Sequence, residues 1–141
     1  MPPATLSRPK PAPSKGAKEE SPSWTIVPVK RGMAIGWKLS PSDIGKLFNL
    51  SEDDYCDPDA VREAMYNIMF ESGHDVPSFA LEPTIRYLAD DTYLIQVRTN
   101  TYLWPGYPLE QHVDTVRKMF HIDVGSEYDQ YFDWHARSVP L

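Results

Sequence analysis

The composition of the chain changes abruptly at Trp24, and no other feature constrains the fold as strongly. Residues 1–23 contain six of the fourteen prolines, no aromatic residue and almost no aliphatic residue beyond Leu6, whereas residues 24–141 contain all seventeen aromatic residues. A segment like residues 1–23 cannot bury enough apolar surface to offset the entropy lost on ordering. The sequence therefore predicts a disordered, Pro-rich N-terminal tail over 1–23 and a single folded domain over 24–141.

The length and cysteine content of the domain limit how it is stabilised. Its 118 residues are close to the commonest domain size, and a core of that size needs neither a disulfide nor a structural metal. Cys56 is the only cysteine, so an intramolecular disulfide and a cysteine zinc cluster are both ruled out. We expect no metal and no cofactor. A lone cysteine favours an intracellular, cytoplasmic location, with the nucleus and mitochondria as alternatives.

The charge of the chain is distributed unevenly. The net charge is −6, but the tail has four basic and two acidic residues, whereas the domain has ten basic and eighteen acidic residues. An acidic domain repels a phosphate backbone, so we expect no nucleic-acid partner. No run approaches the roughly 20 apolar residues of a membrane-spanning helix, so we expect no membrane partner. The acidic surface suits a basic protein partner or is simply solvated.

The tail has two interpretations. Residues 9–13 read Pro-Lys-Pro-Ala-Pro, an alternation that favours extended polyproline II geometry. Such segments dock into aromatic-lined grooves of other proteins. However, Ser14 stands where a full basic, double-proline ligand would place a further proline. The tail is therefore either a ligand or a spacer that solubilises the domain.

Two pairs of strand-like runs predict two β-hairpins. Residues 24–29 and 33–39 are rich in β-branched and aromatic residues and are separated by a turn at Arg31 and Gly32, although Pro28 makes the first run an edge or broken strand. Residues 79–88 and 92–99 form the second pair, joined by a short polar turn. In the last run Tyr93, Ile95 and Val97 share one face, and Arg98 falls on the other.

Two long amphipathic helices are predicted, with a shorter one at 41–48. The first has Asp57 as its cap, Pro58 at its first position and Gly73 as its stop. Tyr66 and Phe70 lie beside its apolar stripe, so this helix is either covered on two sides or presents a second surface. The second helix follows Pro108 and has an apolar face made by Leu109, His112, Val113, Val116, Met119 and Phe120.

Together these elements predict an α+β domain. Hairpins separated by helices favour an antiparallel sheet of about four strands with the two main helices packed on one face. Residues 128–135 are predicted to form either a helical turn or an extended clasp.

The residues that could perform catalysis are few. The sequence contains neither a serine nucleophile elbow nor a glycine-rich phosphate loop. Asp133 and His135 could act together as an acid–base pair if the backbone is extended, and His112 is a further candidate on an apolar helix face. These residues support an alternative function, a small α+β enzyme or small-molecule-binding protein with a pocket between sheet and helices.

Aromatic residues provide the stronger functional signal. They concentrate in two segments, and those that we predict to bind a partner are Trp104, Tyr107, Tyr131, Phe132 and Trp134. Tyrosine and tryptophan dominate interface hot spots because they give a large contact area at low entropy cost, and they also line ligand pockets. A C-terminal latch packed on the sheet would use them equally well. The leading hypothesis is a non-enzymatic interaction or regulatory module that binds another protein or a second copy of itself.

Overall fold

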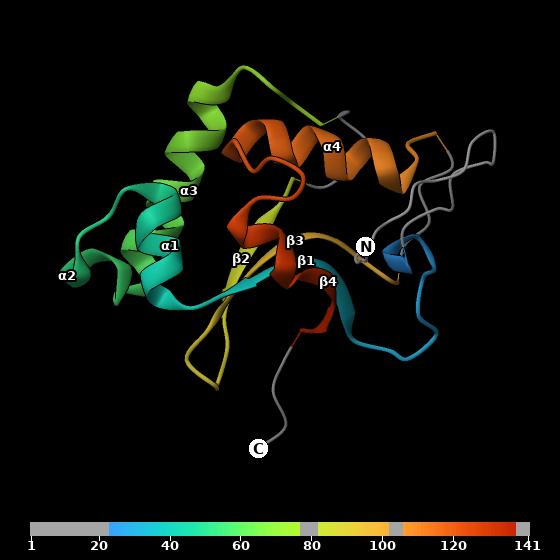
Figure 1. Ribbon diagram of the computed structural model, residues 1–141, viewed down its shortest axis with the longest axis horizontal. Helices are drawn as coiled ribbons and strands as arrows, with labels where there is room; N and C mark the ends of the chain where they lie inside the picture. The colour runs from blue at the N-terminus through green and yellow to red at the C-terminus, as the bar shows by residue number, and fades with distance from the viewer. Residues whose placement is uncertain (1–22, 77–81, 102–105, 138–141) are drawn as a thin grey trace, which may run out of the picture.

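The computed structural model describes residues 23–76, 82–101 and 106–137, which form an α+β fold around a four-stranded antiparallel sheet (Figure 1). The strand order is β2-β3-β1-β4, and neighbouring strands are antiparallel throughout. The strands are β1 (Met33–Leu39), β2 (Thr84–Tyr87), β3 (Tyr93–Thr99) and β4 (Phe132–Ala136). This architecture confirms the predicted fold class.

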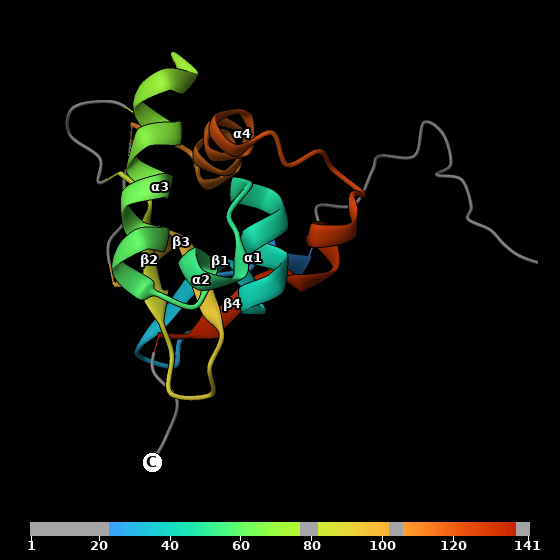
Figure 2. The ribbon, with the colours of Figure 1, turned by 90° about the vertical axis from the view of Figure 1, so that its left-hand side faces the viewer.

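Helices cover one face of the sheet. They are α1 (Pro41–Phe48), α2 (Glu52–Tyr55), α3 (Pro58–Ser72) and α4 (Leu109–Phe120), with short 3-10 helices η1 (Ser23–Thr25) and η2 (Glu127–Tyr131). Figure 2 shows α1, α3 and α4 on the same side of the strands. The main core lies between these layers and includes Ile35, Trp37, Leu39, Ile95, Ile44, Met65 and Val116. Across the described ranges, no helix is both long enough and apolar enough to cross a bilayer.

The ends of α3 follow from local chemistry, as predicted. The Asp57 side chain accepts a hydrogen bond of 3.1 Å from the backbone N–H of Asp59, and Pro58 occupies the first turn, where its missing N–H costs nothing. Gly73 ends the helix in the left-handed region, with φ of 79°. The apolar stripe faces the core, whereas Phe70 is 90 % exposed, so α3 presents the second surface that its sequence allowed.

The predicted first hairpin is wrong. Residues 24–29 form η1 and an irregular segment instead of a strand, and β1 pairs with β3 and β4. Pro28 has no N–H to donate, and the Asn100 side chain binds the backbone carbonyls of Pro28 and Lys30 at 3.0 and 2.6 Å. The position beside β1 is taken by β4, so the C-terminal segment contributes both of its predicted alternatives, a helical turn followed by an extended strand.

The second hairpin is confirmed, since β2 pairs with β3 from Thr84 opposite Gln96 to Tyr87 opposite Tyr93. Residues 79–81 of the predicted run lie outside the described residues. A β-bulge in β3 changes which face of the sheet its last side chains point to. Ile35 lies opposite Arg98 and Gly36 lies opposite Gln96, so Val97 is an extra residue in β3. A bulge of this kind re-aims the side chains that follow it. Arg98 therefore joins the helix-covered face, not the opposite face that strict alternation predicts.

Candidate functional site

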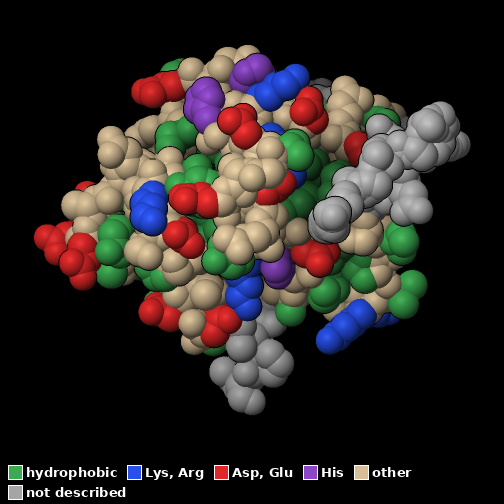
Figure 3. All heavy atoms as spheres, in the orientation of Figure 1, with side chains coloured by type: hydrophobic (Ala, Val, Ile, Leu, Met, Phe, Trp, Pro, Cys, Tyr) green, Lys and Arg blue, Asp and Glu red, His purple; other side chains and the backbone are tan. Residues whose placement is uncertain are grey.

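The C-terminal segment and α4 enclose a groove of about 420 Å³, which we call the α4 groove. It is bounded by Trp24, Glu110, Val113, Asp114, Arg117, Val124, Asp129 and Phe132. These residues come from η1, the first three-quarters of α4, the loop after α4, η2 and the start of β4. On this face, Figure 3 shows hydrophobic side chains recessed among carboxylates.

The apolar walls of the groove are made by the two ends of the domain. The rings of Trp24 and Phe132 meet edge to face, with centroids 5.2 Å apart. The indole N–H of Trp134 donates to the backbone carbonyl of Trp24 at 2.7 Å. Phe132 also packs on the buried Trp37, with centroids 4.6 Å apart. The walls are therefore anchored to the core, and their shape is set before any ligand arrives.

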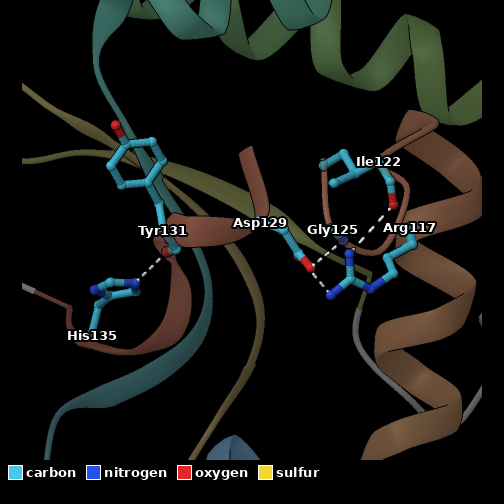
Figure 4. Close-up of polar contacts among 6 residues, drawn as sticks. All are labelled: Arg117, Ile122, Gly125, Asp129, Tyr131 and His135. Carbon is cyan, nitrogen blue, oxygen red and sulfur yellow. Dashed lines mark hydrogen bonds and ion pairs between the residues drawn. The ribbon is translucent and has the colours of Figure 1, made fainter. Parts of the chain in front are cut away.

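An ion pair joins α4 to η2 at the base of the groove (Figure 4). Arg117 Nη2 lies 2.7 Å from Asp129 Oδ1, and both side chains are largely buried. The other Asp129 oxygen accepts from the Gly125 N–H at 2.9 Å. The Arg117 guanidinium lies 5.3 Å from the Trp37 ring centre and 5.1 Å from that of Phe132. The Arg117 guanidinium therefore has a structural role, since a buried charge needs such partners.

The rim of the groove is acidic. Three carboxylates and one guanidinium line it, and the guanidinium neutralises Asp129. Glu110 and Asp114 remain on the exposed surface of α4, one turn apart. Asp114 also contacts Lys118 at 3.1 Å, but an exposed pair of this kind is weak. Apolar walls below an acidic rim can hold an apolar side chain that has a cationic neighbour.

The residues predicted to bind a partner are only partly brought together. Trp104 lies outside the described residues. Phe132 lines the groove and Trp134 lies beside it through its bond to Trp24, whereas Tyr131 is 41 % exposed. Tyr107 is buried, with its ring 4.8 Å from that of His112 and its hydroxyl donating to Thr115. Tyr107 therefore supports the base of α4, and binding by the other residues stays a prediction.

The sequence does not predict a role in the groove for three of its residues, Trp24, Arg117 and Asp129. Trp24 was assigned to a strand, and the Arg117–Asp129 pair was not anticipated. The available signal for Trp24 was that a large aromatic residue begins the domain. For Arg117 there was no comparable signal, since the residue lies on the polar side of its helix pattern and its partner is distant from that helix turn.

The predicted acid–base residues on β4, Asp133 and His135, are hydrogen-bonded to backbone groups and not to each other. The strand is extended, as the hypothesis requires, but each side chain makes its own local hydrogen bond. Asp133 accepts from the adjacent Trp134 N–H at 2.7 Å, and the His135 ring donates to the Tyr131 carbonyl at 2.8 Å (Figure 4). Among the described residues, the His135 imidazole therefore has a backbone carbonyl and not a carboxylate as its hydrogen-bond partner.

His112 is a buried, neutral histidine. It is 1 % exposed, and its Nδ1 accepts a hydrogen bond of 3.1 Å from Arg98 Nε, which the bulge in β3 brings beneath α4. Burial, followed by the nearby charge of Arg98, lowers the pKa of His112 to about 4. Its Nε2 is buried without a hydrogen-bond partner in the part of the chain that the structure describes. A base needs access to a substrate proton, which this site does not offer.

Two other hollows lie near the C-terminal end of α4. One of about 540 Å³ includes Tyr66, Phe70 and Met119, and one of about 340 Å³ includes His74 and His121. Among the described residues, no three His, Cys, Asp or Glu side chains are grouped closely enough to hold a metal ion. Comparison of the chain with family models, with curated proteins and with solved structures finds no match.

Proposed function

We propose that this protein is a non-enzymatic interaction module that binds an extended segment of a partner protein in the α4 groove. The observation that carries this proposal is the pairing of Trp24 with Phe132 beneath the exposed carboxylates of Glu110 and Asp114. Aromatic side chains that are held rigidly supply contact area at little entropy cost. The groove volume lies within the range of about 300–1,000 Å³ that is typical of ligand sites.

The lining of the groove defines the chemistry of the partner. An aliphatic side chain or a proline ring would pack against Trp24 and Phe132, and a neighbouring lysine or arginine would reach Glu110 and Asp114. The acidic surface of the domain would also attract such a segment at a distance. A basic, apolar segment of another protein therefore fits better than an acidic one.

The alternative function, a small enzyme or small-molecule-binding protein, has less support. His112 is neutral and buried, and it does not line the groove. Asp133 and His135 bind backbone groups near them and not each other. A native mass spectrum of the protein purified from its own source would favour this alternative if it contained a small-molecule adduct, and self-association if it contained a dimer.

A peptide array tests the proposal directly. The 141-residue chain is applied to dodecapeptides in which leucine or phenylalanine is flanked by lysine, arginine and proline, and to the same peptides with glutamate replacing each basic residue. We expect binding to the basic set only. The double variant E110Q/D114N should weaken that binding roughly fivefold, since two exposed charge pairs contribute about 0.5 kcal/mol each.

A matched control separates the groove from general charge effects. E52Q/D53N makes the same two changes in the first turn of α2, where both residues are exposed and neither lines the α4 groove. This variant should bind the basic peptides as the unmodified protein does. Equal binding of the acidic peptides, or equal loss in the two double variants, would refute the proposal.

A further inference from the structure

We infer that the chain carries its own ligand for the α4 groove, namely residues 8–18 of the N-terminal arm (residues 1–22). The inference rests on the proposed function, because it uses the same recognition chemistry. It adds the identity of one occupant and a competition between that occupant and any partner.

The described chain begins at the groove itself. Ser23 is its first residue, and Trp24, the next, forms one wall. Trp24 is held by the ring of Phe132 at 5.2 Å and by the indole N–H of Trp134 at 2.7 Å, so the starting point of the arm is fixed. In Figure 1, η1 lies by the N-terminal part of α4.

The length of the arm suits this position. Four residues separate Lys18 from Ser23. In an extended or polyproline II conformation they span about 12–14 Å, at about 3.1–3.5 Å per residue. Glu110 and Asp114 are about 6 Å apart along the helix axis, at about 1.5 Å per residue. Trp24, the neighbour of Ser23, lines the same groove as these two carboxylates, so we expect a linking segment of this length to let Lys18 reach the rim.

The composition of the arm complements the groove. Residues 8–18 contain four basic residues and no acidic residue, and they alternate basic residues with proline; the members are Arg8, Pro9, Lys10, Pro11, Pro13, Lys15 and Lys18. Proline rings pack well against aromatic walls, and a chain already restricted by proline loses little entropy on binding. The rim supplies the opposite charge through Glu110 and Asp114.

An exposed apolar surface on α3 lies farther from the start of the arm. Tyr66 and Phe70 of α3 border a hollow that reaches Met119 near the C-terminal end of α4. The α4 groove, in contrast, includes Glu110 and Trp24. The arm thus begins at the α4 groove and would have to pass along α4 to reach the hollow beside Tyr66 and Phe70.

A tethered ligand competes with a partner by mass action. A short flexible link gives an effective concentration of order 1 mM. If the arm binds with a dissociation constant of similar size, the groove is about half occupied. Neutralising the arm with R8Q/K10Q/K15Q/K18Q should then raise the affinity for a basic array peptide about twofold.

Paramagnetic broadening locates the arm in the full chain. Cys56 is exposed and is the only cysteine, so C56S followed by S14C gives a single site for a nitroxide label. We expect NMR signals of Trp24, Val113 and Val124 to broaden, and those of Tyr66 and Phe70 to remain sharp. The E110Q/D114N changes should reduce the broadening to the level expected for an unbound, tethered label, and E52Q/D53N should leave it unchanged.

Each other outcome overturns the inference. Broadening that is uniform, that centres on α3 or that is undiminished in E110Q/D114N would show that the arm does not use the groove. Broadening in a mixture of isotope-labelled, nitroxide-free protein with unlabelled, nitroxide-bearing protein would assign the arm to a second copy.

The two proposals can fail separately. Array binding by a protein that shows no broadening would remove the arm as a ligand and leave the proposed function standing. Groove-specific broadening together with no array binding, even by R8Q/K10Q/K15Q/K18Q, would support the arm as the occupant and refute binding of a partner segment.

Discussion

The buried imidazole of His112 should make the stability of the domain depend on pH in a window set by one residue. Its pKa is about 4 in the folded protein, whereas an unfolded histidine has a pKa of about 6.5. Below pH 6.5 the His112 imidazole is protonated in the unfolded chain, whereas in the folded protein it stays neutral until the pH falls to about 4. The unfolded state therefore binds more protons in this window, and the free energy of unfolding falls as pH falls.

The size of the effect follows from the two pKa values. Between pH 7 and pH 5, the difference in protonation of this one group lowers the free energy of unfolding by about 2 kcal/mol. Few other shifts interfere, since the lowered pKa of Asp90, caused by its hydrogen bonds to Lys38 and Thr92, places its titration below this window. His112 therefore causes no loss in the free energy of unfolding above pH 6.5, and the loss grows as the pH falls from 6.5 toward 4.

Urea unfolding followed by tryptophan fluorescence measures this difference. The comparison is between the unmodified protein and H112N at pH 7 and pH 5. Asparagine retains an oxygen acceptor for Arg98 but does not titrate, so H112N lowers stability at both pH values and lacks the additional loss of about 2 kcal/mol at pH 5. H121N, which removes an exposed imidazole and keeps His112, serves as the control.

Equal pH dependence in the unmodified protein and H112N would refute this reasoning. So would an NMR titration in which the His112 ring has a pKa near the ordinary 6.5. Either result would mean that water or another polar group reaches the buried Nε2 and stabilises the charged ring.

Two further predictions concern packing. Replacing Gly45 with alanine should lower the free energy of unfolding by about 1–3 kcal/mol despite the better helix propensity, because the new Cβ would overlap the Tyr55 ring. A rise in the thermal midpoint would contradict this prediction. R117M should lower the free energy of unfolding by about 2 kcal/mol, because it leaves the Asp129 carboxylate without its cation. R62M removes an exposed pair and should lower the free energy of unfolding by less than about 0.5 kcal/mol in the same urea assay. Similar losses in the two variants would show that the Arg117–Asp129 pair contributes little.

The elements that could be predicted are those that local chemistry specifies. Asp57, Pro58 and Gly73 each act within a turn of their own position, so the ends of α3 could be read directly. The hairpin of β2 and β3 joins neighbouring runs, and its short turn leaves few competing partners. The first hairpin was predicted wrongly because β-propensity indicates which residues suit a strand but does not determine which strand they pair with.

The candidate site could be predicted only in part. Phe132 and Trp134 were expected to be functional, and both lie at the groove or beside it, whereas Tyr107 is used by the core. Tyr93, Ile95 and Val97 of β3 share the core as predicted, but the face of Arg98 could not be known, because the extra residue in β3 reverses the alternation at that point. That reversal places Arg98 beside the helix face instead of in solvent.

The sequence by itself determined that an acidic, aromatic-rich α+β domain follows a basic, proline-rich arm, where both long helices begin and where the first of them ends. Tertiary structure alone decided that β4 occupies the edge beside β1 and that Trp24 meets Phe132, more than 100 residues later in the chain. The physical reason is the range of the interactions. Caps, turns and charge patterns act over a few residues, whereas strand order and a groove wall depend on which distant segments bury one another best.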